Sequence, residues 1–135
     1  MGERAITTRM VRIWLDDDII HAELLHVEST RADVDVALAA LAELVGQRPR
    51  PLLADIRRVR GVDRGGRTHA AGPEGARYAL ALALLVGSPL SRALGNFFLG
   101  LNKPLVPCRL FTSEPEALAW LRGFLGTPQD PGTAS

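Results

Sequence analysis

Residues 51–70 read PLLADIRRVRGVDRGGRTHA, and this stretch decides the fold class. The apolar run at its start is typical of a strand that is buried on both faces of a sheet. The polar segment that follows is rich in arginine and glycine, and we predict a helix from about Arg64 to His69. A buried strand that leads into a helix is the repeating unit of parallel sheets with helices packed on them.

The sequence before this stretch predicts a β-hairpin. Apolar and polar residues alternate over Met10–Leu15, Asp16–Asp18 form a polar turn, and Ile19–Val27 form the returning strand. In the returning strand we expect Ile20, Ala22 and Leu24 to face inward and His21 and Glu23 to face outward.

Helices and strands then alternate to the end of the chain. Thr30 and Asp33 predict a capping box at the start of a helix that Gly46 and Pro49 end, and Ser113 and Glu116 predict a second capping box. The further elements that we predict are a strand over Leu80–Val86, a helix from Ser88-Pro89 to Pro104, a strand in VPCRLF (106–111) and a helix over Pro115–Leu125. The pattern indicates one α/β domain, a mixed sheet with helices packed on it, over residues 10–126. We expect residues 1–9 to be flexible and residues 127–135 to be disordered.

Composition and charge narrow the class of protein. The chain has 135 residues, a formal net charge of +1 and one cysteine. The near-neutral charge argues against a nucleic-acid partner, and the lone cysteine suits a reducing cytoplasm. The longest apolar run is too short to span a bilayer, so we expect no integral membrane association.

The order of elements, and above all LLADIRRVRGVDRGG (52–66), resembles the STAS family of anti-sigma-factor-antagonist domains, in a bacterial STAS-like branch. In that family a buried strand leads to a loop that reads roughly Asp-Ser-Ser/Thr-Gly at a helix start. A partner kinase phosphorylates the second hydroxyl residue, and the loop docks on that kinase. The matching residues here are Asp63, Arg64, Gly65 and Gly66, so glycine stands at the phosphorylated position. Thr68 lies one helical turn away from it. The resemblance therefore implies the STAS fold and a protein partner, without the usual phosphorylation switch.

The same loop is our candidate site for a partner or an anion. The candidate residues are Asp63, Arg64, Gly65, Gly66 and Arg67. Backbone amides at a helix start and guanidinium groups both attract phosphate and carboxylate groups. The alternative is a solvated turn that Arg57, Arg58, Arg60, Arg64 and Arg67 keep soluble.

The helix over residues 89–101 is our candidate for a homodimer or partner surface. Its broad apolar face includes Leu94, Phe97, Phe98 and Leu101, and few charges accompany it. Gly95 and Gly100 weaken a helix, and close approach of another backbone would explain them. Packing in the core is the alternative. Phe97 and Phe98 point about 100° apart on a helix, so we expect one in the core and one in the interface.

Signals of catalysis are weak. Asp55 is flanked by Arg57 and Arg58, which favours a permanently ionised structural carboxylate. His21 and His26 fall on opposite faces of the predicted strand, His69 lacks a paired ligand, and Cys108 lies within a strand rather than at a helix start. We predict no catalytic residues, no metal and no cofactor.

The sequence therefore favours a non-enzymatic STAS-like interaction and regulatory module. The alternative is a small-ligand or lipid carrier, because the arrangement is also similar to that of CRAL-TRIO-type domains. An enzyme is the third hypothesis, and it would require ionisable groups that converge in a pocket.

Overall fold

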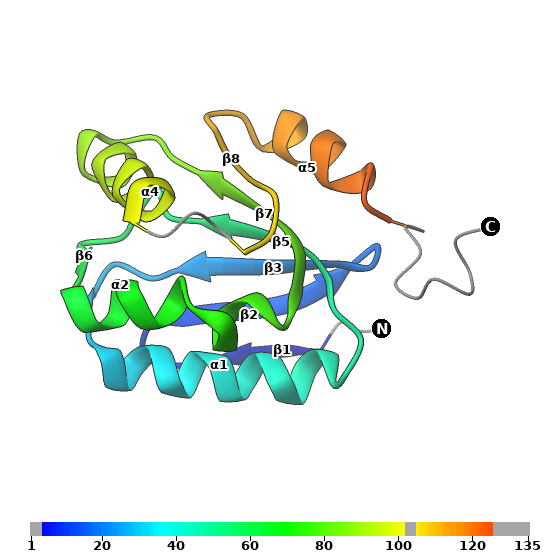
Figure 1. Ribbon diagram of the computed structural model, residues 1–135, viewed down its shortest axis with the longest axis horizontal. Coiled ribbons are helices and arrows are strands. Elements are labelled where there is room, and N and C mark those ends of the chain that lie inside the picture. The colour runs from blue at the N-terminus through cyan, green and yellow to red at the C-terminus, as the bar shows by residue number, and fades with distance from the viewer. Residues whose placement is uncertain (1–3, 102–104, 126–135) are drawn as a thin grey trace.

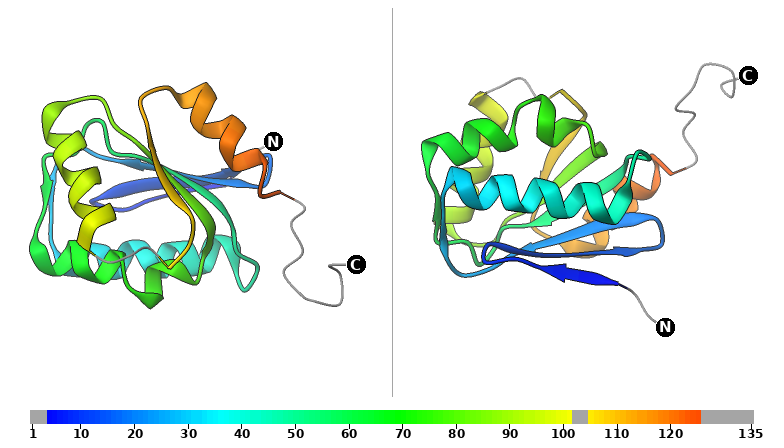
Figure 2. Two further views of the ribbon diagram at one scale, coloured as in Figure 1. Left: turned by 45° about the horizontal axis from the view of Figure 1, so that its top comes forward. Right: turned by 90° about the horizontal axis from the view of Figure 1, so that it is seen from below.

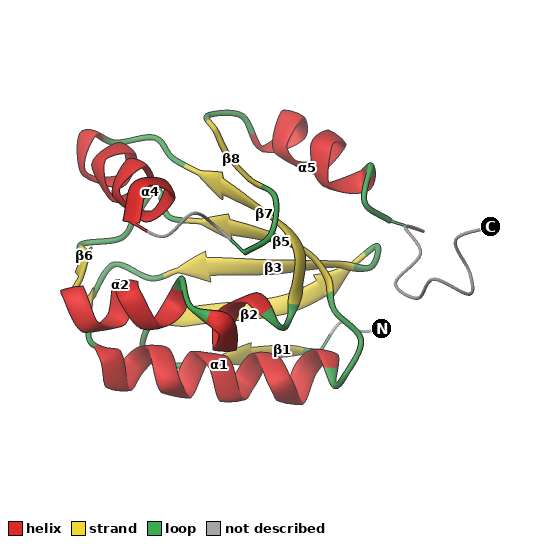
Figure 3. Cartoon of the chain, viewed as in Figure 1, coloured by secondary structure: helices red, strands yellow, loops and turns green. Residues whose placement is uncertain are grey.

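The computed structural model describes residues 4–101 and 105–125. One mixed sheet has the strand order β1-β2-β3-β5-β7-β8, and helices lie on both of its faces (Figure 1, Figure 2). The strands of this sheet are β1 (Ala5–Thr7), β2 (Val11–Asp16), β3 (Ile19–Leu24), β5 (Arg50–Asp55), β7 (Ala79–Leu85) and β8 (Cys108–Phe111). The helices are α1 (Arg31–Val45), α2 (Arg64–Ala70), α3 (Pro73–Ala76), α4 (Pro89–Leu101) and α5 (Glu114–Arg122). The predicted α/β class and mixed sheet are confirmed (Figure 3).

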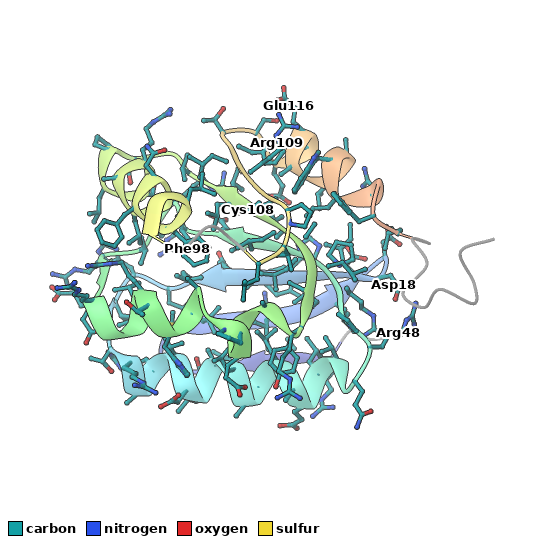
Figure 4. All side chains as sticks on the ribbon, viewed as in Figure 1. Asp18, Arg48, Phe98, Cys108, Arg109 and Glu116 are labelled. Carbon is teal, nitrogen blue, oxygen red and sulfur yellow. The ribbon has the colours of Figure 1, made fainter. Side chains whose placement is uncertain are left out.

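The hairpin is formed by β2 and β3, which pair antiparallel with Asp16 opposite Ile19. Asp17 and Asp18 form the two-residue turn. Their φ values of 53° and 64° lie in the left-handed region, which a tight hairpin turn of this kind requires. Arg48 approaches Asp18 at 3.1 Å (Figure 4), and Arg50 approaches it at 3.2 Å, which ties the turn to the start of β5 and to the segment just before it.

The inner strands are parallel. β5 pairs with β3 on one side and with β7 on the other, and β8 pairs with β7. α1 begins with the predicted capping box, in which Thr30 and Asp33 each accept the other's backbone N–H. Ser113 likewise accepts the N–H of Glu116 at 3.4 Å at the start of α5, and the return bond of a second box is not seen among the described residues.

Some boundaries differ from the prediction. Residues 5–7 form the edge strand β1, although we placed the start of the domain at residue 10. Its residues lie mostly exposed at the edge, so little apolar pattern marks it in the sequence. β3 ends at Leu24 rather than Val27, and α5 spans Glu114–Arg122 rather than Pro115–Leu125. The predicted tail over 127–135 lies outside the described residues.

His21 contradicts the prediction for β3. It is 9% exposed and stacks on Trp14 of β2, with the ring centroids 5.1 Å apart. The sheet has helices on both faces, so a side chain that points away from α1 does not automatically reach solvent.

The two faces of the sheet hold separate core clusters. α5 covers one face, where Ala117 and Leu121 pack on Leu53 and Leu85. α1, α2 and α4 cover the other face, over Ile13 and Ala22 at one end and over Ala54 and Leu84 at the other. No helix among the described residues is long and apolar enough to cross a membrane.

Candidate functional site

The candidate loop lies at the edge of the sheet where the parallel strands β3, β5 and β7 end (Figure 1). Ligands of open α/β sheets commonly bind at this edge. The chain leaves β5 and forms the short strand β6 (Gly61–Val62), which pairs with β4 (Glu28–Ser29). The Asp63 N–H donates to the Ser29 carbonyl at 2.9 Å, so the start of α2 is fixed to the segment before α1.

Asp63 is the N-cap of α2, because its Oδ1 accepts the Gly66 N–H at 2.7 Å. Gly66 is buried, and a Cβ there would lie 2.9 Å from Val62 Cγ1 and 3.3 Å from Val34 Cγ2. Glycine at this position therefore allows α2 to pack closely on α1. The role of Gly66 is structural, at the base of the turn.

Gly65 differs from its neighbour. It is exposed, and a Cβ there would make only ordinary contacts, the nearest at 3.6 Å from Arg31 Cβ. A serine would fit, so packing does not explain why the hydroxyl of the resembling family is absent. Arg31 was missed by the sequence analysis because it lies 34 positions earlier, and only the pairing of β4 with β6 brings it beside Gly65.

The arginines that we grouped in the sequence do not form one cluster. Arg57 binds Asp55 through two nitrogens at 2.9 and 2.7 Å, and this hydrogen bonding raises the pKa of Arg57. Arg60 lies 3.8 Å from Glu28. Arg64 is exposed and makes no ion pair with any described residue. The exposed turn that remains for a partner consists of Arg31, Asp63, Arg64 and Gly65, and we call it the α2 turn.

Arg67 turns inward instead. Its Nη1 donates to the Val62 carbonyl at 2.5 Å, and its guanidinium lies 4.4 Å from the centre of the Phe97 ring. Its Nε is buried and has no hydrogen-bond partner among the described residues. The structure therefore separates Arg67 from the other candidate loop residues.

The candidate dimer residues on α4 are also separated. Phe98 (Figure 4) and Leu94 pack on the core cluster of Ala54 and Leu84, whereas Phe97 is 43% exposed. The side chain of Leu101 lies outside the described residues. Among the described side chains of α4, the large apolar ones that are exposed are Leu90 and Phe97, two turns apart on one face.

Gly95 is explained within the chain. A Cβ at Gly95 would lie 2.7 Å from Leu110 Cδ2 and 3.3 Å from Val86 Cγ1, so the glycine lets α4 pack on β8 and on Val86, the residue that follows β7. Our expectation that another backbone approaches there is wrong for this residue. A Cβ at Gly100 would meet nothing within 4 Å.

The start of α4 contains a buried hydroxyl that the sequence analysis missed. Ser91 is 0% exposed, and its Oγ accepts the N–H groups of Gly87 and Ser88 at 2.9 and 2.8 Å. It also donates to the Ser88 carbonyl at 3.0 Å. Its polar bonds are thus all made within the turn, and Ser91 shapes the entry to the helix.

The remaining polar candidates lie apart from one another. His26 contacts the Arg58 carbonyl at 2.9 Å, and His69 pairs with Asp35 at 2.7 Å. Burial raises the pKa of Cys108 to about 11, so this thiol is protonated at neutral pH and is a weak nucleophile. No cluster of metal-ligating side chains occurs in residues 4–101 and 105–125.

Solved structures show the same fold at low sequence identity. An uncharacterized protein of the DUF3478 family with a SpoIIAA-like fold, from Shewanella loihica PV-4, is 15% identical, with a TM-score of 0.60 over 89% of this chain and 92% of that one. An anti-sigma factor antagonist from Mycobacterium paratuberculosis is 17% identical, with a TM-score of 0.57 over 90% and 95%. The anti-sigma factor antagonist SpoIIAA in its unphosphorylated form is 15% identical, with a TM-score of 0.51 over 90% and 99%. The resemblance to the STAS fold is therefore confirmed.

Sequence comparison adds the family. A search of curated protein sequences gave no significant match. A family model matches residues 13–125, which include the helices α1 to α5 and the sheet from within β2 onward. The chain therefore belongs to the family described as Domain of unknown function (DUF7793), and it has the SpoIIAA-like STAS fold.

Proposed function

We propose that the chain is a cytoplasmic, non-enzymatic regulatory module of the STAS type, and that a protein partner docks on the α2 turn. One observation carries the proposal: the turn is exposed, yet its backbone is held rigidly. The Asp63 cap, the bond from Asp63 N–H to Ser29 and the close packing at Gly66 fix its shape. A preformed surface loses little conformational entropy when a partner binds.

The charge of the turn favours an acidic partner. Arg31 and Arg64 are both exposed beside Gly65, and neither forms an ion pair with a described residue. Guanidinium groups bind carboxylates through two parallel hydrogen bonds. The likeness in fold to anti-sigma factor antagonists supports a protein partner at this edge.

The proposed module lacks the phosphorylation switch of the STAS family that it resembles. Gly65 stands where the resembling family carries the phosphorylated residue, so docking is not controlled by phosphate at that position. Because a side chain fits at Gly65, a partner that docks on this turn would contact the serine side chain of a Gly65→Ser variant directly.

Site-specific photo-crosslinking tests the docking surface. A photoreactive residue at Gly65 is expected to give one discrete adduct in cells of the source organism, and Arg64→Glu in the same chain should abolish it. The control position is Ala119, which is exposed on α5 on the opposite face of the sheet. Equal adducts from both positions, or none from Gly65, would contradict the proposal.

A third crosslinker position tests self-association. Ala93 is exposed on α4 between Leu90 and Phe97. If this face forms a homodimer, the product from Ala93 will have twice the mass of the chain and will disappear with Phe97→Glu. If the chain with the photoreactive residue at Ala93 is recovered only at single-chain mass, the homodimer is removed from the proposal and the partner at the α2 turn is unaffected.

A further inference from the structure

A cavity of about 200 Å³ lies between the sheet and the helices α1, α2 and α4. Well-packed interiors contain few voids larger than a water molecule, so a cavity of this size is unusual. Small side chains from several elements line the cavity and leave this space open. They are Ala22 of β3, Ala54 of β5, Ala37 of α1, Ala70 of α2 and Ala76 of α3. Leu105 also lines it and is 60% exposed, so the cavity reaches the protein surface.

The walls of the cavity are apolar with one exception. Arg67 is the only charged or polar side chain among the described residues that line it. Apolar walls give water few hydrogen bonds, and a smaller engineered cavity of about 150 Å³ stays dry and binds benzene. An apolar ligand of similar size would make the dispersion contacts that the side chains around an empty cavity lack.

Arg67 adds a specific polar requirement. Its Nε is buried and has no partner among the residues that the structure describes, although nearly all buried donors in proteins have one. Its Nη1 is already bonded to Val62, and Phe97 covers one face of the guanidinium. This donor therefore needs an acceptor, and none of the other described side chains that line the cavity supplies an oxygen.

We propose that this cavity binds a small carboxylic acid with a compact alkyl or aromatic body, and that Arg67 binds its carboxylate. A carboxylate accepts from guanidinium nitrogens in a charge-assisted hydrogen bond, and the apolar body fills the space under α4. A neutral hydrocarbon would leave Nε unpaired, and a sugar or nucleotide would lose its hydrogen bonds against apolar walls. The proposal does not depend on the docking surface, because Arg67 is turned away from the α2 turn.

Titration calorimetry with octanoate, and with 1-octanol as its neutral match, tests the proposal. We expect octanoate to bind more tightly than 1-octanol. Arg67→Met should weaken octanoate by about tenfold to a hundredfold, the effect of a lost charge-assisted hydrogen bond, and leave 1-octanol nearly unchanged. Arg64→Met is the matched control: it removes an exposed arginine one turn earlier and should change neither affinity. Ala54→Leu, which fills the cavity, should weaken both ligands.

A measurement on the unaltered protein covers the case in which Arg67→Met does not fold. The side-chain Nε–H resonance of Arg67 should shift on addition of octanoate and stay in place with 1-octanol. Absence of octanoate binding at millimolar concentration would overturn the cavity as a ligand site. Binding that leaves this resonance unmoved, or that survives Arg67→Met intact, would overturn the role of Arg67.

Discussion

The two faces of the sheet are covered by helices in different ways. On one face the single helix α5 brings aromatic rings together, with Trp120 centred 5.6 Å from Phe111 and 5.0 Å from Phe124. On the other face α1, α2 and α4 cover the sheet and leave a cavity of about 200 Å³. The cavity that the described residues form thus lies on the face with more helices. The number of helices on a face decides what is covered, whereas the sizes of the side chains decide whether the space is filled.

Neighbouring leucines on β7 give the largest expected effect. Leu85 is 0% exposed on the α5 face, and Leu84 is 5% exposed and lines the cavity. We expect Leu85→Ala to lower the free energy of unfolding by about 3–5 kcal/mol and Leu84→Ala by about 2–3 kcal/mol, because Leu84 already lacks neighbours on one side. Urea denaturation of both variants measures the difference. A Leu84→Ala loss as large as that of Leu85→Ala would show that the cavity closes in solution.

Replacement of an alanine by leucine on each face tests the same difference in packing by adding volume instead of removing it. Ala83 of β7 is 0% exposed on the α5 face, and Ala54 of β5 lines the cavity. Ala83→Leu should cost about 1–3 kcal/mol because it overpacks a filled core, whereas Ala54→Leu should change stability by less than about 1 kcal/mol. Thermal unfolding with matched denaturant curves gives both values. If Ala54→Leu destabilised the protein as much as Ala83→Leu, the two faces would be equally filled.

The smallest expected effect concerns the first turns of the covering helices. Hydrogen bonds from Arg9 and Thr30 lower the pKa of Asp33 in α1 to about 2, from an ordinary value of 3.8. A carboxyl with a lowered pKa stabilises the folded state above its unfolded pKa, and this contribution is lost as the pH falls from about 4 to about 2. Asp33→Asn should therefore flatten the decline in unfolding free energy over that range. An unchanged decline in Asp33→Asn would contradict the role of the Arg9 contact.

The candidate site was predictable only where its residues are close in the sequence. The helix from Arg64 and the absence of a hydroxyl at Gly65 follow from local pattern and from the family resemblance. Arg31 could not be found in this way, because a two-residue pairing of β4 with β6 brings it to the site. The direction of Arg67 could not be found either, since neighbouring arginines in one loop have the same local signal whether they point to solvent or inward.

By itself the sequence determined the α/β class, the hairpin, the order of the longer elements from β2 onward and the capping box at Thr30, because periodicity and cap chemistry depend on neighbours within a few residues. Only the tertiary structure decided that His21 is buried and that Gly95 admits Leu110 rather than a second chain. It alone also placed Phe98 in the core with Phe97 exposed, and it left a cavity beside Arg67. The physical reason is that burial and empty volume are sums over side chains from distant segments, and no single window of the sequence contains them.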